Sequence, residues 1–84
     1  MMKTPEQYAA LHPKMFRVAF DFLNAHFPPE DTDEWWTKLA EDCSEASIKA
    51  GEDPLAVQLL SGVVNYINEI NMQRRQNNAE SVDN

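Results

Sequence analysis

The spacing of apolar residues along the chain predicts α-helices. Intervals of three and four residues, which place side chains on one face of a helix, separate Tyr8, Leu11, Met15, Val18 and Phe22. No window alternates apolar and polar residues over enough length to indicate a strand. Glycine is rare, and proline stands at the edges of the apolar segments. The pattern therefore predicts an all-α fold.

Capping residues and prolines predict where these helices begin and end. Thr4, Pro5 and Gln7 have the pattern of a capping box with proline in the first helical turn. Pro13 disfavours helical geometry at the residue before it, which predicts a short N-terminal helix that is kinked or broken at Pro13. Three main helices follow, over residues 13–27, 34–50 and 54–75, and we expect a small antiparallel bundle. In this prediction residues 1–75 form a single domain, and the polar segment 76–84 is a disordered tail.

The helix predicted over residues 13–27 carries more apolar surface than two neighbouring helices readily cover. Beside the first apolar row lies a second one, formed by Phe16, Phe20, Leu23 and Phe27. A core this small also gains stability from burial against a second copy of the chain. We therefore expect a homo-oligomer, with a dimer favoured. We assign the contact between copies to Met15, Val18, Phe22 and Trp35.

Three further residues have predicted places in the packing. Trp36 falls on the apolar row of the second helix, whereas Trp35 points about 100° away from it. Trp35 then either covers the Pro28–Pro29 loop or contacts a partner. Gly62 lies inside the third helix, where alanine would be more favourable by roughly 1 kcal/mol. We therefore expect Gly62 to mark a close contact with a neighbouring helix.

The charge of the chain is concentrated in its middle. The 84 residues include 14 acids and 7 bases, a formal net charge of −7. Residues 30–53 alone hold nine acids and two lysines, so the rest of the chain is neutral overall. Such a chain is a poor match for the phosphates of a nucleic acid or for an anionic membrane. The first turns of the helix over 54–75 also lack the Lys and Arg of a DNA-recognition helix.

Acids on the helix predicted over residues 34–50 suggest an alternative function. We assign the acidic face to Glu34, Glu41, Asp42 and Glu45. Such a face could bind a basic protein or imitate the phosphates of a nucleic acid. The other interpretation is a solvated helix face, which Lys38 and Lys49 favour because they interrupt the acids.

The sequence lacks the residue patterns of a catalytic, metal or cofactor site. His12 and His26 are 14 residues apart, which is about 20 Å along a continuous helix, so we expect no bound metal and no cofactor. His26 falls in the last turn of its helix, where positive charge is favourable. Cys43 is the single cysteine, and its acidic neighbours should raise the pKa of the thiol and suppress the reactive thiolate.

The sequence also lacks the features of an exported or membrane-spanning protein. No apolar run approaches the roughly 18 residues that a membrane span requires, and no apolar segment follows the charged start of the chain. We expect a cytoplasmic, non-enzymatic interaction module that self-associates through the apolar faces of its helices. Binding of a basic partner through residues 30–53 stays the alternative.

Overall fold

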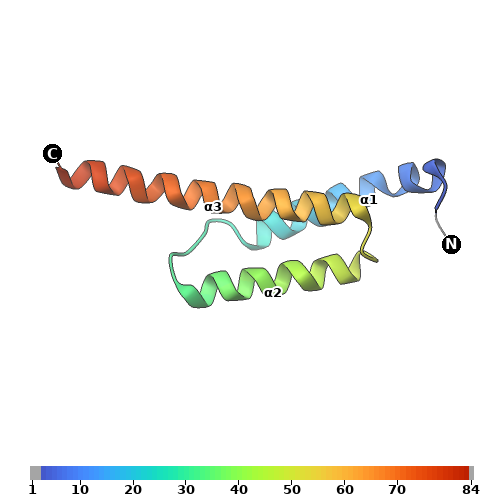
Figure 1. Ribbon diagram of the computed structural model, residues 1–84, viewed down its shortest axis with the longest axis horizontal. Helices are drawn as coiled ribbons and strands as arrows, with labels where there is room; N and C mark the ends of the chain where they lie inside the picture. Colours follow the sequence, from blue (N-terminus) through green and yellow to red (C-terminus); the bar gives the residue numbers. More distant parts are fainter. Residues whose placement is uncertain (1–2, 84) are drawn as a thin grey trace.

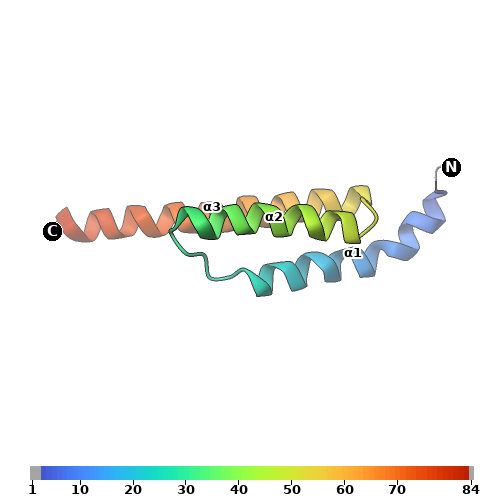
Figure 2. The ribbon, with the colours of Figure 1, turned by 90° about the horizontal axis from the view of Figure 1, so that it is seen from below.

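The described part of the chain consists of three α-helices and the connections between them (Figure 1). The computed structural model describes the backbone of residues 3–83 and the side chains of residues 3–76. The helices are α1 (Pro5–Ala25), α2 (Asp33–Lys49) and α3 (Pro54–Asp83). Successive helices run in opposite directions, so that α1 and α3 are parallel and α2 is antiparallel to both (Figure 1 and Figure 2). The predicted all-α bundle is confirmed.

Side chains close to each helix start define where α1 and α2 begin. The backbone N–H of Thr4 donates to Oε1 of Gln7 at 2.9 Å, and Oγ1 of Thr4 accepts from the backbone N–H of Gln7 at 3.2 Å. This is the predicted capping box. Thr32 begins α2 in a similar way, because its Oγ1 accepts from the backbone N–H of Trp35 at 3.2 Å. The N-terminal ends of α1 and α2 are therefore both determined by local sequence.

The turn between α2 and α3 combines a left-handed backbone with a helix cap. Gly51 has φ of 73°, which glycine adopts at little cost because it has no Cβ. Glu52 is also left-handed, with φ of 55°. Asp53 is 3% exposed, and its Oδ1 accepts from the backbone N–H of Leu55 at 2.9 Å, which caps α3. This turn brings α3 back along α2.

The helix α1 continues through Pro13. It is helical from Pro5 to Ala25 with Pro13 inside, so the alternative of a broken helix is wrong. Proline removes the N–H that would bond to the carbonyl of Ala9, and both residues are exposed, so water can reach that carbonyl. Figure 2 shows α1 changing direction in its N-terminal part, as a kinked helix does.

The helix α3 extends further than the sequence predicted. It runs to Asp83, whereas the prediction placed its end near Arg75. In Figure 1 its C-terminal part projects beyond the other two helices. The tail predicted over residues 76–84 lies mostly outside the residues whose side chains are described.

One row of apolar residues from each helix forms the core. The buried apolar side chains are Met15, Ala19, Phe22, Leu39, Ala56, Leu60 and Ile67. Among them, Phe22, Leu39, Leu60 and Ile67 form the central cluster. Each of α1 and α2 packs mainly on α3 and only slightly on the other. The core is therefore organised around α3.

This core contains two of the residues that were predicted to contact a second copy. Met15 is 2% exposed and Phe22 is 6% exposed, and half-buried Val18 and Trp35 pack against the central cluster. The assignment of Met15 and Phe22 to the contact between copies is therefore corrected, whereas that of Val18 and Trp35 stays a prediction. The physical reason is that α2 and α3 cover only one of the two apolar rows of α1. The other row stays exposed on the outside of the bundle.

Candidate functional site

The uncovered row of α1 lies beside a groove between α1 and α3. Phe16 and Phe20 are 56% and 55% exposed. Further along the same row, the ring of Phe27 stacks on that of Tyr66, with centroids 6.1 Å apart. The groove has a volume of about 420 Å³ and is lined by Leu23, Gln58, Leu59, Gly62, Val63 and Tyr66. We call this row and groove the α1/α3 surface; its apolar part consists of Phe16, Phe20, Leu23, Phe27, Leu59, Gly62, Val63 and Tyr66.

Gly62 lies in the lining of the groove of the α1/α3 surface. A Cβ atom placed on Gly62 would meet no atom within 4 Å, so the predicted close contact with a neighbouring helix is wrong. Gly62 is exposed and belongs to the groove lining. The missing side chain therefore leaves room that an apolar group from outside the chain can enter.

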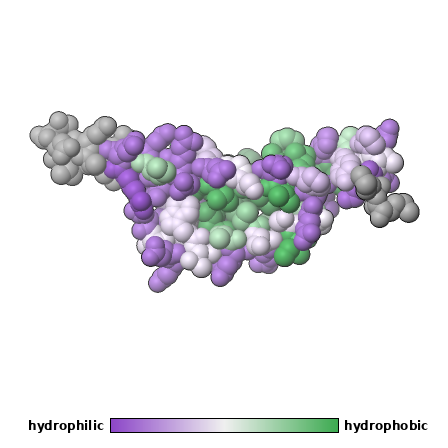
Figure 3. All heavy atoms as spheres, viewed as in Figure 1, coloured by the Kyte–Doolittle hydropathy of each residue, from purple (hydrophilic) through white to green (hydrophobic). Residues whose placement is uncertain are grey.

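A second apolar groove lies between α2 and α3. Figure 3 shows it as a hollow green patch between polar margins in the middle of the molecule. Its volume is about 430 Å³, and it is lined by Ala40, Cys43, Ser44, Ser47, Val57, Leu60, Ser61, Val64 and Asn65. Burial raises the pKa of the Cys43 thiol, so the predicted direction holds but its cause is desolvation. The raised pKa disfavours the nucleophilic thiolate.

The two tryptophans pack against each other at the start of α2. Their rings meet edge to face, with centroids 4.8 Å apart and an interplanar angle of 84°. Both side chains are half-buried and both pack against the central cluster. Trp35 therefore contributes to the core of its own chain.

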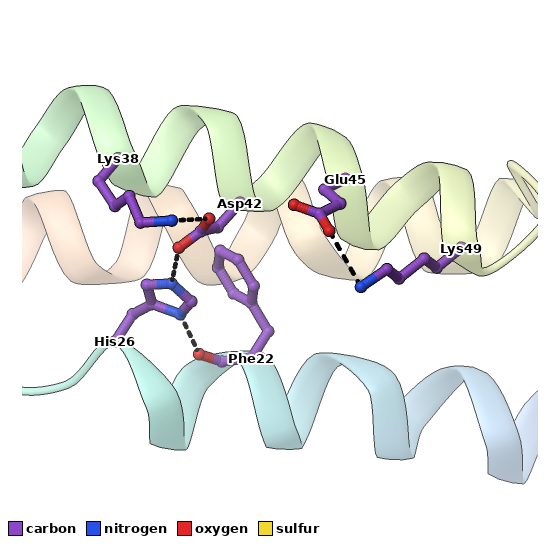
Figure 4. A network of polar contacts seen from close by, with 6 residues as sticks. All are labelled: Phe22, His26, Lys38, Asp42, Glu45 and Lys49. Atoms are coloured by element: carbon purple, nitrogen blue, oxygen red, sulfur yellow. Dashed lines mark hydrogen bonds and ion pairs between the residues drawn. The ribbon is translucent and has the colours of Figure 1, made fainter.

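A polar network joins the end of α1 to α2 (Figure 4). The Nδ1 atom of His26 lies 2.7 Å from the carbonyl oxygen of Phe22, and its Nε2 atom lies 2.8 Å from Oδ2 of Asp42. On its other oxygen, Asp42 accepts from Nζ of Lys38 at 2.9 Å. The ring of Phe22 stacks on the imidazole, with centroids 4.2 Å apart. The sequence placed His26 at a helix end but did not reveal its partner on α2.

The His26 network borders a hollow of about 280 Å³. Its lining consists of Phe22, His26, Asp42, Glu45, Ala46 and Lys49. Glu45 and Lys49 form an ion pair there at 3.0 Å. Both nitrogens of the His26 ring already face an oxygen of the protein, so neither is free for proton transfer to a ligand. In residues 3–76, no group of three or more His, Cys, Asp and Glu side chains is placed to hold a metal ion.

Two of the four acids of the predicted acidic face, Asp42 and Glu45, are paired with other side chains. Glu34 and Glu41 are exposed and have no ion pair with any described side chain. Asp42 instead faces inward, and the hydrogen bond to His26, followed by that from Lys38, holds its pKa below the usual range. Glu45 is paired with Lys49. The four acids therefore do not form one open, unpaired face.

The connection between α1 and α2 is held by the C-terminal half of α3. Arg74 donates from Nη1 to the carbonyl oxygen of Pro29 at 3.2 Å. Arg75 forms an ion pair with Asp31 through both Nε and Nη2. Asn71 and Pro29 are buried at this contact. The two arginines, which were predicted to lie at a helix end, thus hold a connection more than forty residues away in the sequence.

The Asp31–Arg75 pair predicts a loss of stability in acid. Hydrogen bonds from Arg75 hold the pKa of Asp31 below its usual range. A carboxylate with a lowered folded-state pKa contributes stability above its unfolded pKa of about 3.9, and this is lost as the pH falls through the folded value. We expect Arg75→Met to reduce the acid sensitivity of folding, measured by circular dichroism below about pH 5.

The matched control for this prediction is Arg17→Met. Arg17 pairs with Asp21 at 3.3 Å within one exposed helix face, with side chains 74% and 62% exposed. The Asp31–Arg75 pair is exposed too, but it joins α3 to a distant connection, whereas the Arg17–Asp21 pair lies within one helix and joins no separate elements. An exposed pair within one helix contributes little to stability, so acid sensitivity should stay that of the original chain. Equal acid profiles for Arg75→Met and the original chain would contradict the prediction. Neither substitution changes the contacts of Asp42, so the contribution of Asp42 to acid sensitivity is the same in both variants.

Two further findings bear on function. Among residues 3–83, none of the helices combines the length and the apolar character needed to cross a bilayer. The chain matches no protein-family model, and comparisons with curated proteins and with solved structures also find no match.

Proposed function

We propose that this protein is a cytoplasmic, non-enzymatic interaction module that forms a homodimer through the α1/α3 surface. The observation that carries the proposal is the exposure of Phe16 and Phe20 on successive turns of α1. Large apolar side chains gathered in one exposed patch are typical of protein interfaces. The lone cysteine, which has no disulfide partner in its own chain, supports a cytoplasmic location.

The shape of the α1/α3 surface supports a second copy as the occupant. A twofold axis that lies across the helices brings the same surface of both copies together with the helix direction reversed. The exposed pair Phe16 and Phe20 lies toward the N-terminal end of this surface, and the groove beside Leu23 and Tyr66 lies toward its C-terminal end. The projecting rings of one copy would therefore face the groove of the other, where Gly62 leaves room.

The distribution of charge supports the same arrangement. The net charge of −7 resides entirely in residues 30–53, which contain α2 and its connections. Two copies therefore repel each other where their α2 helices approach. Contact through α1 and α3 buries the least charged surface and keeps the two acidic helices at a distance. A basic partner would instead be attracted to α2.

Changing Phe20 to aspartate should dissociate the dimer without unfolding the chain. A buried, unpaired carboxylate at the interface is costly, so we expect the dissociation constant to rise at least about tenfold. Analytical ultracentrifugation over a concentration series measures this, and circular dichroism should show unchanged helix content. A monomer at tens of micromolar for the original chain would overturn the proposed function.

Val57→Asp is the matched control for Phe20→Asp. Val57 is 38% exposed, but it lines the groove between α2 and α3. The same introduced charge should therefore leave the dimer intact. Dissociation by Val57→Asp and not by Phe20→Asp would move the interface to the other groove and contradict the assignment.

Binding of a basic protein is the second candidate function. Its support is the exposure of Glu34 and Glu41 on α2. A complex of this kind weakens strongly with added salt, whereas the apolar dimer contact should change little. Glu34→Lys together with Glu41→Lys would abolish binding to a basic partner and leave the dimer in place.

A further inference from the structure

The imidazole of His26 has a hydrogen-bond environment that only its protonated form satisfies. Its Nδ1 atom faces the carbonyl oxygen of Phe22 and its Nε2 atom faces Oδ2 of Asp42, at 2.7 and 2.8 Å. A carbonyl and a carboxylate both accept hydrogen bonds. Neutral imidazole has one N–H and can donate to only one of them, whereas imidazolium donates to both.

The surroundings of the ring also favour positive charge. His26 caps the C-terminal end of α1, where the helix dipole is negative, and its ring stacks on Phe22. The charged groups that face it come from α2: Asp42 and Glu45, with Lys38 and Lys49 paired to them. Within the described side chains, α3 contributes none to the lining of this hollow.

The contact between His26 and Asp42 is the main polar connection between α1 and α2. Among the hydrogen bonds and ion pairs of described side chains, no other one joins the α1 end to α2. These two helices also share the smallest interface of the bundle. If this contact is lost, little other packing between α1 and α2 remains to hold the two helices together.

We propose that His26 is a proton-dependent latch that fastens the C-terminal end of α1 to α2. When the ring is protonated it donates to both oxygens and the latch is closed. When the proton dissociates, one nitrogen presents a lone pair to an acceptor oxygen, and the end of α1 loosens from α2. The stability from the latch is therefore present while the ring is protonated and is lost over the range of pH in which the ring becomes neutral.

The test compares His26→Gln with His12→Gln across that range. His12 lies on the same helix but is exposed, so it is a matched control. Unfolding in urea, followed by tryptophan fluorescence at one protein concentration, gives the folding equilibrium constant of each variant. Between about pH 5.5 and about pH 8, we expect the advantage of the original chain over His26→Gln to fall by about threefold to tenfold. The ratio of the folding equilibrium constants of the original chain and His12→Gln should stay constant over the same range of pH.

A second measurement covers the case in which His26→Gln does not fold. Nitrogen NMR of the imidazole in the original chain distinguishes a ring with two N–H groups from a neutral ring with one. At about pH 6, we expect both nitrogens of His26 to carry protons in the folded protein. A folded chain with a neutral His26 ring at that pH would overturn the latch, as would a pH-independent effect of His26→Gln. Neither result depends on the dimer.

Discussion

Changing Phe22 to alanine should destabilise the folded chain by about 3 to 5 kcal/mol, the usual cost of truncating a buried aromatic residue. Phe22 is 6% exposed and belongs to the central cluster with Leu39, Leu60 and Ile67. Its ring also stacks on that of His26. Removing it opens a cavity where the three helices meet, and it deprives the imidazole of its stacking partner. Urea unfolding followed by tryptophan fluorescence measures the loss.

Phe20→Ala is the matched control, because it makes the same truncation two residues earlier in α1. Phe20 is 55% exposed, so we expect its effect on the stability of the monomer, measured below the dissociation constant of the proposed dimer, to stay within about 1 kcal/mol. A small helical domain has little stability in reserve, so Phe22→Leu, which removes less volume, serves if Phe22→Ala does not fold. Equal losses for Phe22→Ala and Phe20→Ala would contradict the inward placement of Phe22.

The two phenylalanines show what the sequence of α1 could and could not establish. The spacing predicted two apolar rows on one helix, and the structure has both. Which row faces inward is a tertiary property, since it depends on where α2 and α3 lie around α1. The rows of Met15 and of Phe16 are similarly apolar, so local pattern gave no ground for preferring one. Three of the four predicted contact residues, Met15, Val18 and Phe22, were therefore taken from the row of α1 that faces the core.

Helix ends were predicted well wherever the signal was local. The capping box at Thr4 and the turn at Gly51 each depend on residues within a few positions of one another. By contrast, the end predicted near Arg75 relied on the expectation that arginines mark a helix C-terminus. In the structure Arg74 and Arg75 instead contact the connection between α1 and α2. A residue's role in such a contact depends on a partner that helix periodicity does not identify.

The polar network shows the same limit. His26 and Asp42 are 16 residues apart in the sequence, and they lie on different elements. From the sequence, His26 is a candidate metal ligand or a charge at a helix end, and Asp42 is part of a predicted acidic face. Their contact requires α1 and α2 to lie antiparallel in one particular register. Once that register is known, the contact between His26 and Asp42 accounts for the position of both side chains.

Neighbouring leucines in α3 provide a prediction that separates stability from association. Leu60 is 1% exposed in the central cluster, whereas half-buried Leu59 lines the groove of the α1/α3 surface. Consecutive residues on a helix point about 100° apart, so the same truncation tests two different surfaces. Leu60→Ala should cost about 2 to 5 kcal/mol of folding free energy.

Leu59→Ala should cost less than half as much stability, because the side chain is only partly removed from water. It should instead weaken the proposed dimer, since it removes apolar surface from the groove into which the rings of the second copy would fit. Urea unfolding and analytical ultracentrifugation on both variants measure the two effects. If Leu60→Ala weakened association at unchanged stability, α3 would present the opposite face to its neighbours. The groove beside Gly62 would then lose its role as the acceptor for Phe16 and Phe20.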